Sequence, residues 1–358
     1  MAVSAKPSME ELLRLVVEQG ATDLHLSANS PPHLRLDDRL VATDHPPLSG
    51  DGIKELAYGL ISPEKVERFE RWKELDFAFS VEGLARFRAN YFFQRGYVGV
   101  AIRMLPFRIM NFVELGLPAK LMTELCEKPQ GLVLVTGATG SGKTTTLASM
   151  VDYLNLNKSY HIVTIEDPIE YTHTNKQSIL DQREVGNDTQ SFAQGLKHVL
   201  RQDPDVILIG EMRDLEAIET ALIVAETGHL VLATLHTSDA MQTVNRIVDV
   251  FPSSQQNQVR VQLSLELLAV VSQQLIPKAS GRGRVLATEF LVANHAVRSL
   301  IREQKIHQLY SVIQTGQKEG MKTMNQTLYD LYANRVITLE HALARSSDPD
   351  DLKRLMTR

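Results

Sequence analysis

The sequence predicts an α/β protein built from two domains. Residues 119–358 contain short, continuously apolar runs that alternate with helical patterns, which is typical of a parallel sheet buried on both faces. Residues 1–105 instead combine helices with strand pairs separated by single glycines, as in an antiparallel sheet. Residues 106–118 carry a proline at each end and show no clear period, which indicates a linker.

Composition narrows the class of protein. The chain has 358 residues, of which 43% are apolar, enough to supply a core to each of two domains. Its net charge of −5 gives no basic field, so we do not expect nucleic acid as a partner. Cys126 is the single cysteine, which excludes an internal disulfide and a tetracysteine zinc site and fits a cytoplasmic location. We find neither a signal peptide nor a membrane-spanning run, so membrane association is expected only through partners.

The first domain is expected to begin with a helix near 8–18 and an extended segment from Asp23. A hairpin-like pattern follows around Asp37 and Asp38, and then two helical stretches. From Leu75 onwards the pattern indicates three antiparallel strands.

The second domain contains four apolar runs, at residues 132–136, 161–165, 206–210 and 230–234. Helical patterns separate them, so the order predicts a parallel sheet in a RecA-like or doubly wound arrangement. Beyond Met241 we expect mostly helix, interrupted by one strand at 285–291 and ending in a charged helix near Asp350.

A phosphate-binding loop follows the first apolar run directly and precedes a helical pattern. Its sequence, GATGSGKT, matches G-x-x-x-x-G-K-[ST], in which glycines let backbone N–H groups point at phosphate oxygens. The lysine places a positive charge on the β- and γ-phosphates, and the threonine hydroxyl is a ligand for Mg²⁺. A glycine-rich turn without a ligand is the alternative. The expected nucleotide-binding residues are Gly137, Ala138, Thr139, Gly140, Ser141, Gly142, Lys143, Thr144 and Thr145.

Acidic side chains follow the next two apolar runs, at the strand ends where open α/β sheets bind ligands. Glu166 and Glu170 follow the second run, and Glu211 follows the third. Because no aspartate ends the third run, Glu211 is the residue expected to hold metal or position water. The alternative is a structural role in helix capping or in a salt bridge to Arg213 or Arg183.

Two histidines flank the fourth apolar run. His229 precedes it and His236 follows it. A histidine beside a strand is usually packed or hydrogen-bonded, but this strand is predicted to lie next to the phosphate loop, so a catalytic role is the second interpretation for both.

Four motifs carry a resemblance that covers nearly the whole chain. GATGSGKT, TIEDPIEY, RQDPDVILIGEMRD and TGHLVLATLHT, in this order, resemble the Walker A, Asp box, Walker B and His box of the secretion ATPase superfamily. The resemblance implies a PAS-like N-terminal domain, a RecA-like domain, six subunits in a ring, and ATP with Mg²⁺ as ligands.

The same resemblance assigns roles within the site. It implies that Glu170 activates the attacking water and that Glu211 is the Walker B acid, next to Mg²⁺ on Thr144. It also implies that Arg88 and Arg103 of the first domain approach the triphosphate. A solvated strand face is the alternative for these arginines.

A further local match favours one branch of the superfamily. Residues 296–303, AVRSLIRE, resemble a motif of type IV pilus retraction ATPases of the PilT type, with departures at Val297 and Ser299. This segment is either a partner surface or a packing helix. The resemblance implies an ATPase motor that retracts pili at the inner face of the cytoplasmic membrane, against an inner-membrane platform protein. The alternatives are an accessory retraction ATPase, a nucleotide-binding regulatory subunit with little turnover, and a DNA translocase.

Overall fold

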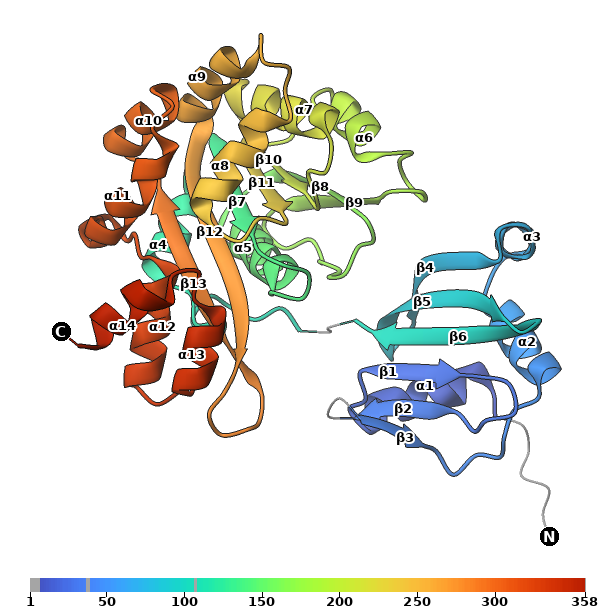
Figure 1. The fold of residues 1–358 in the computed structure, drawn as a ribbon. Helices are drawn as coiled ribbons and strands as arrows, with labels where there is room; N and C mark the ends of the chain where they lie inside the picture. Colours follow the sequence, from blue (N-terminus) through green and yellow to red (C-terminus); the bar gives the residue numbers. More distant parts are fainter. Residues whose placement is uncertain (1–6, 37–38, 106–107, 358) are drawn as a thin grey trace. The chain divides into compact units, whose positions relative to one another are not determined.

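The structure is a computed structural model that describes residues 7–36, 39–105 and 108–357. It divides into two compact units, residues 1–108 and 109–358 (Figure 1). The expected turn at Asp37 and Asp38 lies outside the described residues, as do residues 106 and 107 of the expected linker. Phe112 and Leu117, further along that segment, are buried in a core of the second unit.

The first unit is a six-stranded antiparallel sheet in the order β3-β2-β1-β6-β5-β4, with three helices packed against one face. The helices are α1 (Met9–Glu18), α2 (Gly50–Tyr58) and α3 (Pro63–Trp72). The strands are β1 (Asp23–Leu26), β2 (His33–Leu36), β3 (Arg39–Ala42), β4 (Glu74–Val81), β5 (Ala85–Gln94) and β6 (Tyr97–Met104). In β5 the buried residues alternate with more exposed ones, because successive side chains of a strand point to opposite faces.

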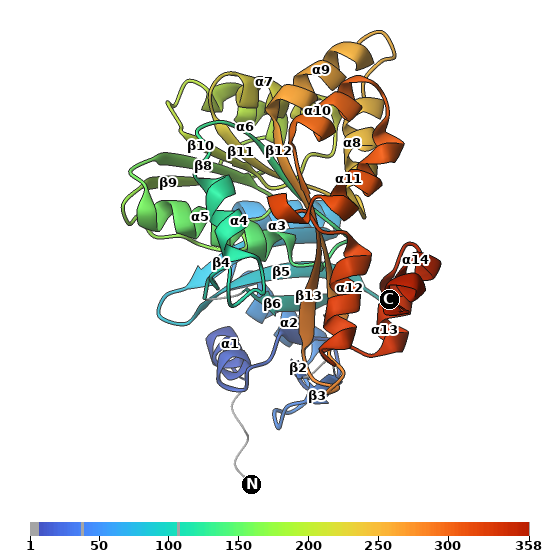
Figure 2. The same cartoon turned by 90° about the vertical axis from the view of Figure 1, so that its left-hand side faces the viewer.

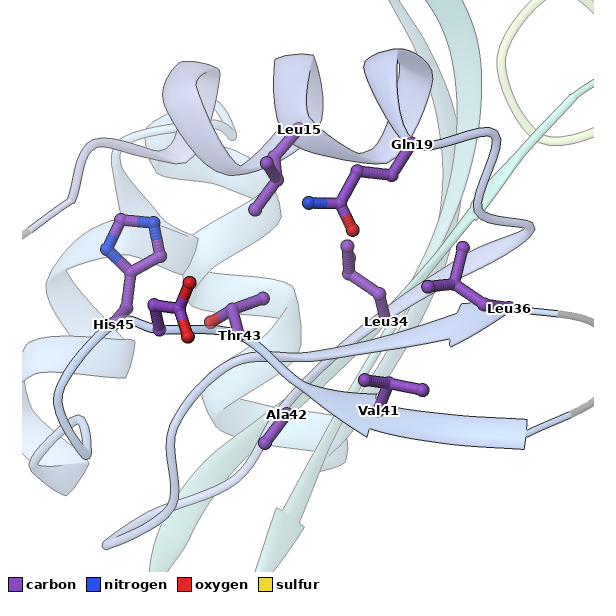
Figure 3. A pocket seen from close by; sticks show the side chains of 9 residues that line it. Leu15, Gln19, Leu34, Leu36, Val41, Ala42, Thr43 and His45 are labelled. Carbon is purple, nitrogen blue, oxygen red and sulfur yellow. The ribbon is translucent and has the colours of Figure 1, made fainter.

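A hollow of about 450 Å³ lies inside this first unit, between α1 and the β2–β3 hairpin (Figure 3). Its lining is apolar at Leu15 and on the strands, whereas polar side chains lie at Gln19, at the end of α1, and near His45. The lining residues are Leu15, Gln19, Leu34, Leu36, Val41, Ala42, Thr43, Asp44 and His45. None of them belongs to the phosphate motif, so this hollow is not the nucleotide site predicted from the sequence.

The second unit is built on a seven-stranded sheet in the order β13-β12-β7-β11-β10-β8-β9. Neighbouring strands are parallel except for β12 and β13, which form an antiparallel pair. The strands are β7 (Gly131–Thr136), β8 (His161–Glu166), β9 (Ile179–Glu184), β10 (Val206–Ile209), β11 (Leu230–Leu235), β12 (Leu267–Pro277) and β13 (Arg284–Val292).

The expectation of helix over most of the region after Met241 was wrong for residues 267–277. They form β12, which lies between β7 and β13. The segment LLAVVSQQLIP has polar residues within an apolar run, so neither a helical nor a strand period stands out. Its partner β7 lies more than a hundred residues earlier in the sequence, so the pairing is decided by tertiary contacts.

Helices cover both faces of this sheet. On one face α4 (Ala119–Cys126) and α5 (Lys143–Asn157) pack in a core with alternate residues of the strands. The opposite face is covered by α6 (Phe192–Val199), α7 (Leu215–Glu226), α8 (Ala240–Asp249), α9 (Gln256–Glu266), α10 (His295–Arg302), η1 (Ile306–Gln308) and α11 (Leu309–Thr315). The strands buried between these layers are the continuously apolar runs of the sequence.

The last helices form a smaller cluster at one end of the β12–β13 pair (Figures 1 and 2). They are α12 (Met324–Ala333), α13 (Leu339–Arg345) and α14 (Pro349–Met356), which follow η2 (Gln317–Glu319). Ile276 of β12 and Ala287 of β13 contribute to the core of this cluster. Nowhere in the described ranges is there a helix with the length and apolar character needed to cross a bilayer.

Candidate functional site

The phosphate loop joins the end of β7 to the start of α5. Because β7, β8, β10 and β11 are parallel, their carboxyl ends meet at this edge of the sheet. Gly142 is the N-cap of α5 with φ 93°, a left-handed conformation that favours glycine. At Gly137 a Cβ atom would lie 2.4 Å from the carbonyl oxygen of Gln273, so β12 lies close against the loop. Glycine is therefore required at 137 for close approach and at 142 for its dihedral angle.

Lys143 begins α5 and is buried. Its Nζ donates hydrogen bonds to the carbonyl oxygens of Gly137 (2.8 Å) and Ala138 (3.1 Å). Burial lowers the pKa of Lys143, and the charges of Glu211 and Glu170 oppose that shift. Lys143 is thus within electrostatic range of both Glu211 and Glu170.

Glu211 follows β10 and is held by two neighbouring side chains, those of Arg213 and His236. Its carboxylate lies 2.7 Å from Nε of Arg213 and 3.0 Å from Nε2 of His236. Burial would raise the pKa of Glu211, but the hydrogen bond from Arg213 and the nearby His236 outweigh it and lower that pKa. The salt bridge considered as the structural alternative is therefore present with Arg213. Arg183 instead donates to the carbonyl oxygen of Asp188.

The two histidines lie at opposite ends of β11. His236 follows the carboxyl end and contacts Glu211, so it belongs to the site. His229 precedes the amino end, and its Nδ1 lies 3.1 Å from the carbonyl oxygen of Val224. The structure therefore does not bring His229 to the phosphate loop of its own chain, and its catalytic role stays a prediction. The reason is that one histidine precedes the strand and the other follows it, so the whole length of β11 separates them.

Several residues at the site were not expected from the sequence. On β12, the Ser272 hydroxyl lies 2.9 Å from that of Thr136, and Gln273 donates to the hydroxyl of Thr146 at 2.7 Å. The Tyr171 hydroxyl lies 2.9 Å from that of Thr145. Tyr171 directly follows Glu170 in the Asp-box motif, so its position was visible in the sequence although its contact was not.

Glu166 is buried and hydrogen-bonded. It accepts hydrogen bonds from the hydroxyl of Thr164 (2.7 Å) and from the side-chain amide of Gln182 (3.1 Å). The contact with Gln182 connects β8 to β9.

Arg88 and Arg103 belong to the first unit, where they are direct neighbours across β5 and β6. Both are exposed. Nε of Arg103 lies 2.8 Å from the carboxylate of Asp23 on β1. The two side chains therefore share one face of the sheet, and their approach to the triphosphate stays a prediction.

The segment 296–303 forms most of α10, which packs against α9. Arg298 donates hydrogen bonds to backbone carbonyl oxygens at the end of α9 and in the segment before α10. They are those of Ser264 (2.7 Å), Leu265, Leu267 (3.1 Å) and Ala293 (3.0 Å). Leu300 is half-buried against the main core. Of the two interpretations of this segment, these contacts fit the packing helix.

Comparison with known proteins gives two matches that decide the family. The family described as Type II/IV secretion system protein matches residues 86–282. The type IV pilus retraction ATPase PilT of Pseudomonas aeruginosa is 47% identical over 95% of this chain and 98% of that protein. The chain belongs to the type II/IV secretion system family. Another relative, the type IV pilus ATPase PilU of the same organism, is 42% identical over 96% of this chain and 90% of that protein.

Solved structures of family members share the fold. A crystal structure of the pilus retraction motor PilT with bound ADP is 53% identical, with a TM-score of 0.92 over 97% of this chain and 99% of that one. The ATPase DotB of Legionella pneumophila is 26% identical, with a TM-score of 0.80 over 94% of each chain. The predicted family and the predicted α/β fold, with a PAS-like first domain and a RecA-like second domain, are thus confirmed.

Proposed function

We propose that this family member is an ATPase motor that hydrolyses ATP in the presence of Mg²⁺ and powers the retraction of type IV pili. One observation carries the proposal. Lys143 of the phosphate loop lies within electrostatic range of Glu170 and Glu211, in a chain that resembles PilT over nearly its full length. A loop that binds phosphate, together with two acids beside it, is the arrangement that phosphoryl transfer to water requires.

Nucleotide binding requires Lys143 to change partners. Its Nζ now donates to two carbonyl oxygens of its own loop. When ATP binds, we expect that charge to turn to the β- and γ-phosphates, with backbone N–H groups of residues 137–144 around the oxygens and the N-terminus of α5 adding partial positive charge. The lysine is therefore pre-positioned rather than recruited from elsewhere.

The acids have separate roles. The Thr144 hydroxyl and the Glu211 carboxylate offer oxygen atoms, which are the ligands that Mg²⁺ takes, so these residues fit that ion. When bound, Mg²⁺ neutralises charge that develops on the phosphate oxygens. Glu170 orients the attacking water, and His236 holds the carboxylate of Glu211.

Movement follows if the site is completed only on closure. Arg88 and Arg103 would supply positive charge to the γ-phosphate when first-domain and second-domain surfaces meet, within one chain or between chains of a hexameric ring. Arginine charge at this position contributes about 10³ to 10⁵ in rate, so closure and hydrolysis would be coupled.

We place the ring at the cytoplasmic face of the inner membrane, attached through a platform protein of the pilus machine. An accessory retraction ATPase is the second candidate, because the chain is similar to two type IV pilus ATPases of one organism, PilT at 47% and PilU at 42% identity.

The enzymatic proposal is tested with Lys143→Ala and Glu170→Gln. Lys143→Ala should reduce ATP turnover by about 10³-fold or more because it removes the charge on the phosphates. Glu170→Gln should retain binding of a non-hydrolysable ATP analogue and lose hydrolysis. The matched control is Lys158→Ala, since Lys158 is a part-exposed lysine with a long contact to Glu127 (3.9 Å). Wild-type turnover in Lys143→Ala would refute the assignment of the phosphate site.

The motor proposal has its own experiment. Mass measurement with and without the analogue should show a nucleotide-dependent ring, and deletion of the gene should abolish surface twitching. A strict monomer at every concentration would contradict the ring. Normal twitching after deletion would favour the accessory role.

A further inference from the structure

The loop that carries Glu170 is held by side chains of β9. The amide of Gln182 donates to the carbonyl oxygen of Tyr171 (2.8 Å) and accepts a hydrogen bond from the backbone N–H of His173 (2.8 Å). On the other side of Glu170, the backbone N–H of Ile169 donates to the carboxylate of Glu184 at 3.1 Å. The backbone is therefore fixed on both sides of Glu170 by one neighbouring strand.

A second attachment joins this loop to the phosphate-loop helix. Tyr171 is 5% exposed, and its hydroxyl lies 2.9 Å from that of Thr145. Thr145 is in the first turn of α5, directly after Lys143 and Thr144. Burial raises the pKa of Tyr171, so its hydroxyl is neutral at physiological pH and can donate or accept this hydrogen bond.

We propose that Tyr171 is a positioning residue for hydrolysis, whose hydroxyl fixes the distance between Glu170 and the phosphate-loop helix. The inference rests on the proposed ATPase function and on the role of Glu170 in it. Gln182 and Glu184 attach this loop to β9, whereas the Tyr171 hydroxyl attaches it to α5, so without that hydroxyl the loop of Glu170 can shift relative to α5. Misplacement of a catalytic group by about 1 Å can cost about 10²-fold in rate. Binding of the phosphates depends on Lys143 and backbone N–H groups, so it should be little affected.

The test is Tyr171→Phe, which removes the hydroxyl and leaves the buried ring. We expect kcat to fall about 10- to 100-fold. The Kd for a non-hydrolysable ATP analogue should change by less than about threefold, and the melting temperature by only a few degrees. The matched control is Tyr153→Phe, because Tyr153 also lies on α5 and its hydroxyl donates to Glu127 at 3.1 Å, away from the phosphate loop. Its kcat should stay within about twofold of wild type.

A second comparison separates positioning from general damage. In a Glu170→Gln background, Tyr171→Phe should lower the single-turnover rate no further, because the group that it positions is already gone. Wild-type kcat in Tyr171→Phe would overturn the inference. So would a parallel loss of kcat, binding and melting temperature, or an additive loss in the double variant. If wild-type protein hydrolyses no ATP, or if Glu170→Gln keeps full activity, the proposed function or its assignment of Glu170 fails instead.

Discussion

The phosphate loop and α10 both carry sequence motifs, but only the motif of the phosphate loop predicts the contacts of its residues. In the phosphate loop, the glycines and Lys143 lie where the sequence predicts them, between β7 and α5. In α10, Arg298 lies on an amphipathic helix, a pattern that also suits a partner surface, yet its guanidinium donates to carbonyl oxygens inside the fold. A pattern of glycines predicts backbone conformation directly. The position of a charged residue on a helix does not predict which groups its side chain contacts.

The contacts of Arg298 have a clear structural purpose. The last carbonyl groups of a helix have no partner within that helix. Arg298 binds three of the carbonyl oxygens between Ser264 and Leu267, where α9 ends and β12 begins. Through β12, this junction leads to Ser272 and Gln273, which contact the phosphate-loop elements. The two regions are therefore structurally connected although their motifs are far apart in sequence.

The largest loss of stability should come from a substitution at Gly137, the phosphate-loop glycine that lies close against β12. Gly137→Ala places a Cβ atom against a backbone oxygen of Gln273 at φ 140°, so we expect a loss of about 4 kcal/mol in unfolding free energy, from overpacking and from the dihedral angle. Nucleotide binding should weaken at least about 100-fold, since the N–H groups that hold phosphate shift. Denaturant unfolding and analogue binding measure both.

Gly140→Ala is the matched variant in the same loop. Its Cβ would meet no atom within 4 Å, so only the left-handed φ of 77° is unfavourable, at about 1 to 2 kcal/mol. Equal losses of stability at the two positions would show that close approach of β12 is not what requires glycine at 137.

The second effect tests whether α10 packs or recruits a partner. Arg298→Ala leaves several carbonyl groups without their hydrogen-bond donor, so we expect a loss of about 3 kcal/mol in unfolding free energy. ATPase activity and ring assembly should fall with stability. Arg302→Ala, on the same helix but exposed and with one long hydrogen bond to Ser264 (3.3 Å), should change stability by about 0.5 kcal/mol or less.

A stable, fully active Arg298→Ala protein that fails only in pilus retraction would reverse this interpretation. In that case α10 would be a partner surface, as one reading of the sequence motif allows. Melting temperature, turnover and twitching should therefore be measured on the same variant.

The third prediction concerns a loss of folding stability in mild acid, caused by His173. Burial lowers the pKa of His173, in the loop of Glu170, from 6.5 to about 4. The unfolded chain therefore protonates His173 below about pH 6.5, whereas the folded chain protonates it only near pH 4. The folded state is therefore destabilised as the pH falls from 6.5 to about 4. We expect about 2 kcal/mol less stability at pH 5 than at pH 7 from this residue. His173→Gln should remove this dependence, whereas His295→Gln, an exposed histidine on α10, should leave it in place.

The smallest predicted effect is on the pH dependence of stability at Glu266 of α9, and its sign is opposite to that at His173. Burial and the like charge of Glu226 raise the pKa of Glu266. The folded state thus holds this proton more tightly than the unfolded chain, so the contribution to stability is present below the ordinary pKa and is lost as pH rises through the raised one. Hydrogen exchange at the end of α9 should be slower in mild acid than at neutral pH, relative to Glu266→Gln. No difference between the two proteins would contradict the shift.

The sequence by itself determined the fold class, the four parallel strands that carry the site, and the phosphate loop. These depend on local features: apolar runs long enough for buried strands, and glycines at the spacing that a phosphate loop requires. The acids Glu170 and Glu211 could be placed as well, because the ends of parallel strands meet at one edge of a sheet.

Tertiary structure alone decided which of these residues share a site. His229 and His236 are close in sequence, but the length of β11 separates them, whereas Gln273 reaches the phosphate-loop helix from more than a hundred residues away. Arg298 likewise has partners that its own helix does not contain. The physical reason is that backbone conformation depends mainly on neighbouring residues, while the partner of a buried polar side chain is set by whichever unpaired group the packed fold brings within hydrogen-bond reach.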